Sequence, residues 1–138
     1  MTTVLNQQLG FKAILHTDFD SALNQLTQAL KEEGFGVLTE IDVQSTMRNQ
    51  IGELYPQFRI IGACNPLLVH QALSSFPDVG LLLPCNITAV EIGEGKVEIP
   101  IIDPLLMMEI AQEPGLQRVA EEARARLRRV SLSLMENH

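Results

Sequence analysis

A Cys-Asn pair occurs twice in the sequence, once in Ala63–Pro66 (ACNP) and once in Leu83–Asn86 (LPCN). A cysteine thiolate is a nucleophile, and a neighbouring amide can hold a ligand through hydrogen bonds. Cys64 directly precedes an expected helix, whose first amide groups would lower the pKa of the thiol and favour the thiolate. The candidate catalytic residues are therefore Cys64 and Cys85. The candidate ligand-binding residues are Cys64, Asn65, Pro66, Pro84, Cys85 and Asn86.

Both motifs also have a structural interpretation. Cysteine is among the most buried residue types and often packs as a small hydrophobic side chain. Asn65 followed by Pro66 is typical of a helix start, with asparagine as the N-cap and proline in the first helical position. Asn86 is harder to explain in this way, because asparagine is a poor strand former. Its side chain is expected either to line a pocket or to bond the backbone near a bulge caused by Pro84. Structural cysteines, a reactive thiol and a bound metal or ligand all remain open at this stage.

Other side chains with catalytic potential form weaker patterns. The histidines are scattered at His16, His70 and His138, and the sequence has no Cys-x-x-Cys spacing, so no metal site is expected. His70 is a candidate base near the first motif. Glu40 and Asp42 share a strand face and could form a carboxylate pair, although Asp42 is also placed to cap a helix. No glycine-rich phosphate loop or nucleotide fingerprint occurs, so the cofactor stays unknown.

Charge is unevenly distributed along the chain. The 138 residues include 17 acidic and 10 basic side chains, which gives a net charge of −7. This balance, with one tyrosine and five phenylalanines as the only aromatic residues, argues against a nucleic-acid partner. Residues 118–129 nevertheless carry five arginines and two glutamates, a local charge of +3. This segment is either a solvated or dimer-facing helix surface or a site for an anion or a partner.

The chain has the sequence features of one cytosolic domain. The N-terminus lacks the basic start and apolar run of a secretory signal, and no apolar stretch approaches the ~20 residues that cross a bilayer. A cytoplasmic location and no membrane partner are therefore expected. In a reducing compartment two cysteines are more often free thiols or ligands than a structural disulfide. With no repeat or linker in the sequence, residues 1–138 are expected to form a single domain.

Hydrophobic periodicity and capping residues predict five strands and five helices. In chain order these are a strand over 10–15, a helix from 17–20 to a stop at Gly34, a strand over 37–43, a short helix over 43–51, a strand over 58–65, a helix over 66–76, a hairpin of 80–92 and 96–102, a short helix over 103–108 and a long helix over 116–134. This order predicts an α+β fold with about five strands in one sheet and helices packed on one face. The hairpin must be antiparallel, whereas the helical connections also permit parallel pairs.

Three ordered strings of the sequence carry a resemblance to a known family. They are GFGVLTEIDV at 34–43, RIIGACNP at 59–66 and GLLLPCN at 80–86. Together they resemble the domain-of-unknown-function 302 family. The resemblance implies a β-α-β-β-β-β-α framework with a mainly antiparallel sheet, and commonly a homodimer. It implies no catalytic residue, because no reaction is established for the family.

The leading hypothesis is a cytosolic homodimer that binds a small molecule or a partner protein near the two Cys-Asn motifs. The first alternative is a thiol-based enzyme or redox sensor that uses Cys64 with or without Cys85. The second alternative is a purely structural or interaction module. No nucleic-acid or membrane partner is expected in any of them.

Overall fold

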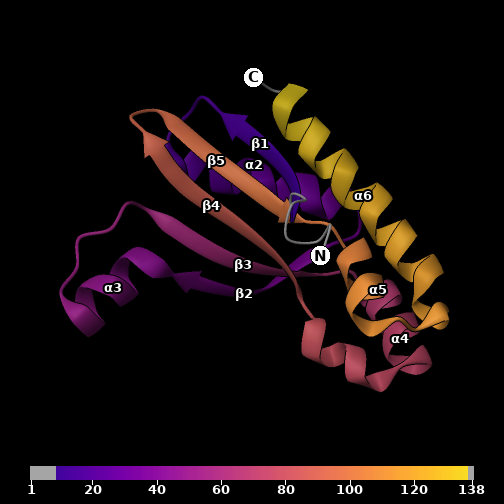
Figure 1. Cartoon of the computed structure of the whole chain (residues 1–138). Helices are drawn as coiled ribbons and strands as arrows, with labels where there is room; N and C mark the ends of the chain where they lie inside the picture. The colour runs from indigo at the N-terminus through magenta and orange to yellow at the C-terminus, as the bar shows by residue number, and fades with distance from the viewer. Residues whose placement is uncertain (1–8, 137–138) are drawn as a thin grey trace.

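Five strands form one sheet in the spatial order β1-β5-β4-β3-β2, and every neighbouring pair is antiparallel. The structure, a computed structural model, describes residues 9–136 (Figure 1). The strands are β1 (Gly10–Leu15), β2 (Gly36–Asp42), β3 (Phe58–Cys64), β4 (Cys85–Gly93) and β5 (Lys96–Ile102). The α+β fold with a mainly antiparallel sheet is confirmed, and the parallel pairs that the helical connections permitted are not formed.

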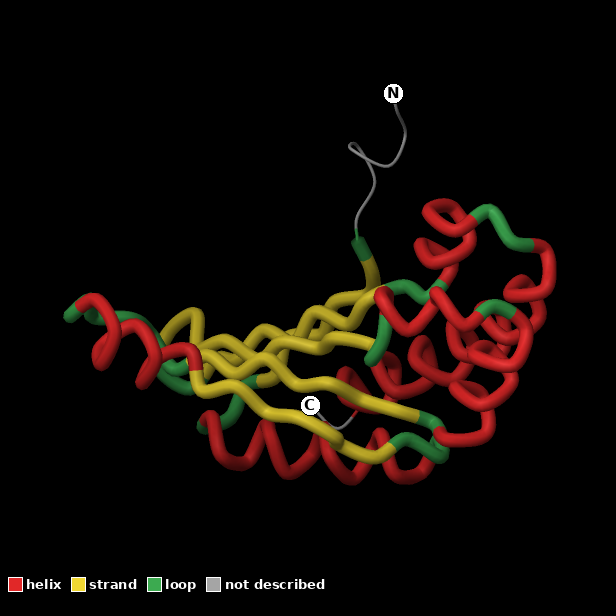
Figure 2. The backbone as a smooth tube through the Cα atoms, turned by 90° about the horizontal axis from the view of Figure 1, so that it is seen from below, coloured by secondary structure: helices red, strands yellow, loops and turns green. Residues whose placement is uncertain are grey.

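Helices lie on one face of the sheet and at both of its ends (Figure 1). They are α2 (Phe19–Glu32), α3 (Val43–Ile51), α4 (Pro66–Ser75), α5 (Leu105–Ala111) and α6 (Gln117–Glu136), with 3-10 turns η1 (Pro77–Leu82) and η2 (Pro114–Leu116). Helix α3 lies at one end of the sheet, and α4 and α5 lie at the other. Helices α2 and α6 pack on the sheet and on each other, as Figure 2 shows, while no helix formed by residues 9–136 lies over the middle of the opposite face. The sheet therefore has one covered face and one open face.

Two hydrophobic clusters hold these layers together. The main core fills the space between the sheet and helices α2 and α6, and its large buried side chains include Leu15, Leu26, Leu30, Ile87, Ile99, Ile101 and Leu127. A second cluster joins α4, η1, α5 and the start of α6 through Ala72, Val79, Met107, Leu116, Val119 and Ala120. Since α6 contributes to both clusters, it fixes the position of α4 relative to the sheet.

Side-chain caps confirm the predicted starts of α2 and α3, whereas the short helix predicted over 103–108 spans Leu105–Ala111. The carboxylate of Asp18 accepts a hydrogen bond from the backbone N–H of Ser21 at 3.1 Å at the start of α2. Asp42 caps α3 in the same way, accepting from the N–H of Ser45 at 3.0 Å. Gly34 follows α2 with φ of +83°, a left-handed conformation that glycine adopts without strain. Local chemistry thus determines where these helices begin and end.

Two of the local predictions are wrong. Residues 80–84 do not belong to a strand, because the 3-10 turn η1 continues to Leu82 and buries Val79 in the second cluster, so β4 begins at Cys85. Strand β2 was expected to bury one face, yet it is an edge strand whose Val37, Leu38 and Ile41 side chains are exposed. Helices α2 and α6 are centred over β1, β5 and β4, which leaves β2 beyond the main core.

Candidate functional site

The sheet register brings the two Cys-Asn motifs together. Strands β3 and β4 are neighbours, with Ala63 opposite Cys85 and Gly62 opposite Asn86. Cys64 is the next residue along β3, so the two cysteines lie on adjacent strands, 21 positions apart in the sequence. The two motifs therefore form one region of the molecule.

Strand alternation divides this region between the two faces of the sheet. Cys85 shares the covered face with its partner Ala63, whereas Cys64 and Asn86 point to the open face, because successive side chains of a strand point to opposite sides. Pro84 is also on the open face, where its ring packs over Gly62. Asn65 and Pro66 begin α4 and lie on the helical side. The six candidate residues thus do not converge on one cavity.

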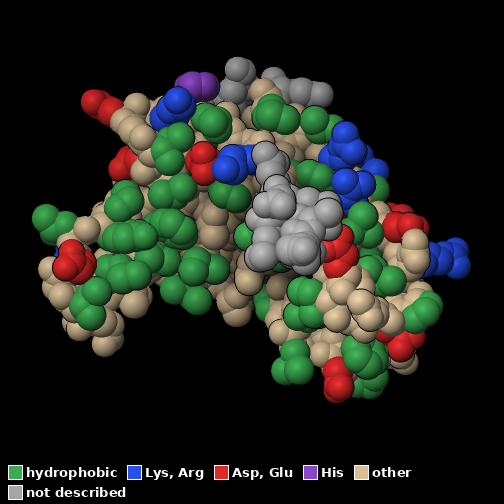
Figure 3. All heavy atoms as spheres, in the orientation of Figure 1, with side chains coloured by type: hydrophobic (Ala, Val, Ile, Leu, Met, Phe, Trp, Pro, Cys, Tyr) green, Lys and Arg blue, Asp and Glu red, His purple; other side chains and the backbone are tan. Residues whose placement is uncertain are grey.

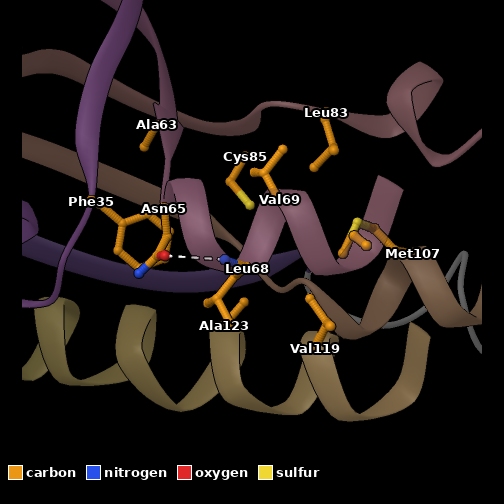
Figure 4. Close-up of a pocket in the computed structure, with 11 residues that line it drawn as sticks. Phe35, Ala63, Asn65, Leu68, Val69, Leu83, Cys85, Met107, Val119 and Ala123 are labelled. Carbon is orange, nitrogen blue, oxygen red and sulfur yellow. Dashed lines mark hydrogen bonds between the residues drawn. The ribbon is translucent and has the colours of Figure 1, made fainter. Parts of the chain in front are cut away.

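Cys85 lines a small interior pocket of about 20 Å³ between the sheet, α4, α5 and α6 (Figure 4). The lining is apolar except for Asn65: Phe35, Ala63, Asn65, Leu68, Val69, Ala72, Leu83, Cys85, Met107, Val119 and Ala123. Such a volume corresponds to about one water molecule, so the pocket holds no metabolite in this conformation. Burial, with a smaller contribution from nearby Cys64, raises the pKa of Cys85 to about 11.

The expected activation of Cys64 is wrong. Burial raises the pKa of the Cys64 thiol instead of lowering it. At the start of α4 it is the side chain of Asn65, not the thiol, that accepts the hydrogen bond from the N–H of Leu68, at 3.2 Å. Both cysteines are free thiols, and both are protonated at neutral pH. Neither has the lowered pKa of an activated cysteine nucleophile.

Asn65 connects three helices. It is only 6% exposed. Its side-chain oxygen Oδ1 caps α4, while its Nδ2 donates at 3.5 Å to the backbone oxygen of Glu33, the residue directly after α2. This backbone oxygen of Glu33 also accepts a shorter hydrogen bond, 2.9 Å, from Nη1 of Arg126 on α6. The structural interpretation of Asn65 is confirmed, and the same side chain also lines the cavities of this region.

Replacing Asn65 with alanine is expected to lower the free energy of unfolding by about 1–2 kcal/mol, because the side-chain cap of α4 is lost and the backbone N–H of Leu68 is left without its acceptor. The measurement is urea unfolding followed by circular dichroism. Asn86→Ala is the matched control, since Asn86 is the asparagine of the second motif but is exposed on the open face; its expected change is within about 0.5 kcal/mol. Equal losses in both variants would contradict the capping role.

A larger groove of about 740 Å³ opens between α4 and the first half of α6. It shares Asn65, Leu68 and Val119 with the interior pocket. Its lining has an apolar part and a polar part: Gly34, Asn65, Pro66, Leu67, Leu68, Gln71, Gly115, Arg118, Val119, Glu122 and Arg126. Sequence reasoning predicted Asn65 and Pro66 here but missed the contribution of α6. The positive segment 118–129 was the signal that pointed to it.

Most of that positive segment is paired within the fold. Arg126 contacts Glu122 at 2.7 Å, and Arg129 contacts the carboxylate of Glu33 at 2.9 Å. Arg124 pairs with Asp103 at 3.0 Å. Within residues 9–136, no ion pair or hydrogen bond engages Arg118 or Arg128. Of these two, only Arg118 lines the groove.

The weaker candidates from the sequence have structural partners or lie elsewhere. Glu40 and Asp42 both contact Arg59, at 2.6 and 3.6 Å. The hydrogen bond from the backbone of Ser45 is the main cause that lowers the pKa of Asp42. His70 is exposed on α4 and does not line the groove.

Clusters of metal-ligating side chains and membrane-spanning helices are both absent from the described part of the chain. No three His, Cys, Asp or Glu side chains of residues 9–136 gather in a way that could hold a metal ion. None of the helices in this range combines the length and apolar character needed to span a bilayer.

Comparisons with known proteins agree with the fold. The chain resembles the crystal structure of an uncharacterized conserved DUF302 protein from Bacillus stearothermophilus, with a TM-score of 0.84 and 23% sequence identity, over 93% of this chain and 99% of that chain. At this identity the likeness shows a shared fold. No curated protein matches the chain. The model of the family described as Domain of unknown function DUF302 matches residues 11–134. The chain therefore belongs to the DUF302 family, as the three ordered strings of its sequence indicated.

Proposed function

We propose that this protein is a homodimeric small-molecule-binding module whose ligand lies in the groove between α4 and α6. The observation that carries the proposal is the joint lining of this groove by the first Cys-Asn motif, through Asn65 and Pro66, and by the unpaired Arg118. Its volume, about 740 Å³, is within the range of pockets that bind metabolites. No other cavity found among the described residues combines comparable volume with a positive side chain.

The lining indicates the chemical class of the ligand. Leu67, Leu68 and Val119 supply an apolar wall, and Arg118 supplies a positive charge that forms no ion pair with an acidic side chain of the described region. Arg126 is held by Glu122 and by a backbone oxygen, so it shapes the groove and is not free to bind an anion. A small molecule with an apolar part and one anionic group matches this arrangement. Burial of the apolar part supplies affinity, and the arginine fixes the orientation.

The free thiols fit a reducing, cytosolic compartment, which we include in the proposal. Thiol chemistry is the less favoured alternative, because burial raises the pKa of both cysteines. Two alternatives remain: a site for a partner protein in place of the small molecule, and a purely structural module. Binding of a small molecule in the groove would exclude both.

Octanoate is a suitable probe of the groove, because it has a single carboxylate and an apolar chain. We expect octanoate to raise the Tm of the protein in a concentration-dependent manner, and octanol to do so much less. Arg118→Gln is expected to weaken octanoate binding about tenfold, the effect of losing one charge-assisted hydrogen bond. Arg128→Gln is the matched control, since Arg128 is a second unpaired arginine of α6 outside the groove.

Chemical-shift mapping places the bound probe on the structure. Perturbed amides at the start of α4 and in the first half of α6 are the expected result. Unchanged affinity of Arg118→Gln, or perturbations confined to other surfaces, would refute the groove as the binding site.

A further inference from the structure

Three cavities follow one another through the second hydrophobic cluster. The interior pocket shares the lining residues Asn65, Leu68 and Val119 with the groove between α4 and α6. It shares Cys85 and Met107 with a third cavity, of about 60 Å³, which lies between the start of β4, the end of β5 and α5. The groove and the third cavity have no lining residue in common. The interior pocket is therefore the middle of the row, and the shared side chains form the walls between neighbouring cavities.

The lining becomes apolar from the groove inward. The groove carries the guanidinium of Arg118, which forms no ion pair within residues 9–136. In the interior pocket Asn65 is the one polar side chain, and both ends of its amide group are already hydrogen-bonded. In the third cavity the one charged side chain, Asp103, is paired with Arg124. A buried charge without a partner is costly, so only the uncharged end of a ligand can extend beyond the groove.

Cys85 and Met107 stand between the interior pocket and the third cavity. In Figure 4 their side chains reach into the pocket from β4 and α5. The thiol of Cys85 stays protonated at neutral pH, because burial raises its pKa to about 11, so it adds no charge to the wall. Ala63 and Cys85 border the pocket from the covered face of the sheet. The sheet therefore separates this pocket from the hydrophobic side chains that gather over the strands of the open face in Figure 3.

The side chains around the interior pocket have room to rearrange. Among the described residues, seven partly buried apolar side chains pack against the second cluster, whereas three pack against the main core. Leu68 is one of the seven, and its neighbour Val69 is also half-buried. Met107 is unbranched and flexible, so it changes shape without a shift of α5. Rotation of Leu68 would join the pocket of about 20 Å³ to the groove, and rotation of Met107 would join it to the third cavity.

We infer that the ligand of the groove is the anion of a long unbranched aliphatic acid, whose carboxylate lies at Arg118 and whose chain runs past Leu68 and Val119 to Cys85 and Met107. The inference rests on the proposed function and specifies the class of ligand for the same groove. A chain without branches fits, because it has to pass between two neighbouring side chains, and each methylene group that it buries adds to affinity. The inference also assigns a role to Cys85 of the second motif, as an uncharged wall at the end of the chain.

The test is calorimetric titration of the full-length protein with octanoate, decanoate and dodecanoate, each below its micellar concentration. Octanoate is the reference, because the groove alone has the volume to hold it. We expect the Kd to fall roughly fourfold for each methylene group that is added, which is the effect of burying that group completely. Arg118→Gln is expected to weaken binding of all three acids by the same factor, since the carboxylate lies at the same place in each complex.

Val69→Phe tests the path of the chain. Val69 lines the interior pocket but not the groove, so a phenylalanine at this position fills the pocket and leaves the groove open. We expect this variant to bind octanoate within about twofold of the wild type and to lose the gain from longer chains. Leu73→Phe is the matched control, since Leu73 is on the same helix and lines neither cavity, and it is expected to keep the gain.

A second measurement uses the wild-type protein, isotope-labelled at its methionine methyl groups. The methyl signal of Met107, assigned by its loss in Met107→Leu, is expected to shift more with dodecanoate than with octanoate. The signals of Met47 and Met135, which line none of the three cavities, are expected to stay in place.

The outcomes separate the inference from the proposed function. If octanoate binds but longer chains bring no gain, the inference is overturned and the groove remains the site. The same holds if Val69→Phe keeps the gain of the wild type, or if dodecanoate leaves the Met107 signal unmoved. Absence of octanoate binding refutes the proposed function, and the inference falls with it.

Discussion

Near neutral pH, Cys85 is expected to react with iodoacetamide about 100-fold more slowly than a cysteine in an unstructured peptide. Burial and nearby Cys64 raise the pKa of Cys85 from 9.0 to about 11. Only the thiolate reacts, and its fraction falls tenfold for each unit by which the pKa rises. The measurement is timed alkylation of the native protein, with each cysteine followed by peptide mass spectrometry. The urea-unfolded protein is the control, in which both cysteines should react at the peptide rate.

The same shift predicts a pH dependence of stability. In the unfolded chain the thiol of Cys85 loses its proton near pH 9.0, whereas in the folded protein it keeps the proton up to about pH 11. Between these two pH values the folded state therefore binds more protons than the unfolded state. As a result, the free energy of unfolding falls as pH rises from 9.0 to about 11. Urea midpoints of the wild type and Cys85→Ser should converge across this range. Rapid alkylation near neutral pH would contradict both expectations and support the thiol-based alternative.

Gly62→Ala is expected to destabilise the protein by about 1–3 kcal/mol, the usual cost of overpacking a closely packed site. A Cβ atom at this position would collide with Oγ1 of Thr39 and lie 2.7 Å from Cγ of Pro84. Thr39 and Pro84 flank Gly62 on the open face, so relief requires a shift of β2 or of the segment that leads into β4. The expected measurement is a lower urea midpoint with an unchanged m value.

Gly36→Ala is the matched control for this prediction. Gly36 is also a strand glycine of the same region, and it pairs with Cys64, but a Cβ atom there meets nothing within 4 Å. We expect its effect to be within about 0.5 kcal/mol. An equal loss in both variants would show that the cost comes from strand propensity and not from the contact with Pro84.

The two copies of the Cys-Asn motif have different roles in the structure. Cys85 closes the interior pocket on the covered face, while Pro84 and Asn86 lie on the open face with Cys64. Asn65 caps α4 and joins it to α2 and α6. The resemblance between the two Cys-Asn pairs is therefore a likeness of sequence, because each copy meets different neighbours. The directions of the side chains therefore do not favour a single site that uses both cysteines as a pair.

Much of the local structure was determined by the sequence alone. Asp42 and Asn65 cap the helices that they were predicted to cap, since a capping bond involves residues only three positions apart. The hairpin of β4 and β5 was predicted for a similar reason: its turn contains Gly95 with φ of +68°, a conformation suited to glycine. The family also followed from three ordered strings, which the match over residues 11–134 confirms.

The tertiary structure alone decided the burial of β2, the chemistry of the cysteines and the composition of the groove. Alternation in β2 indicates a strand but not its place at the sheet edge, which depends on the pairing of distant strands. The pKa of Cys64 was expected to fall because of the adjacent helix, but burial in the folded protein raises it. Arg118 joins Asn65 in the groove only because α6 packs beside α4. Such contacts arise between residues far apart in the chain, where local spacing carries no information.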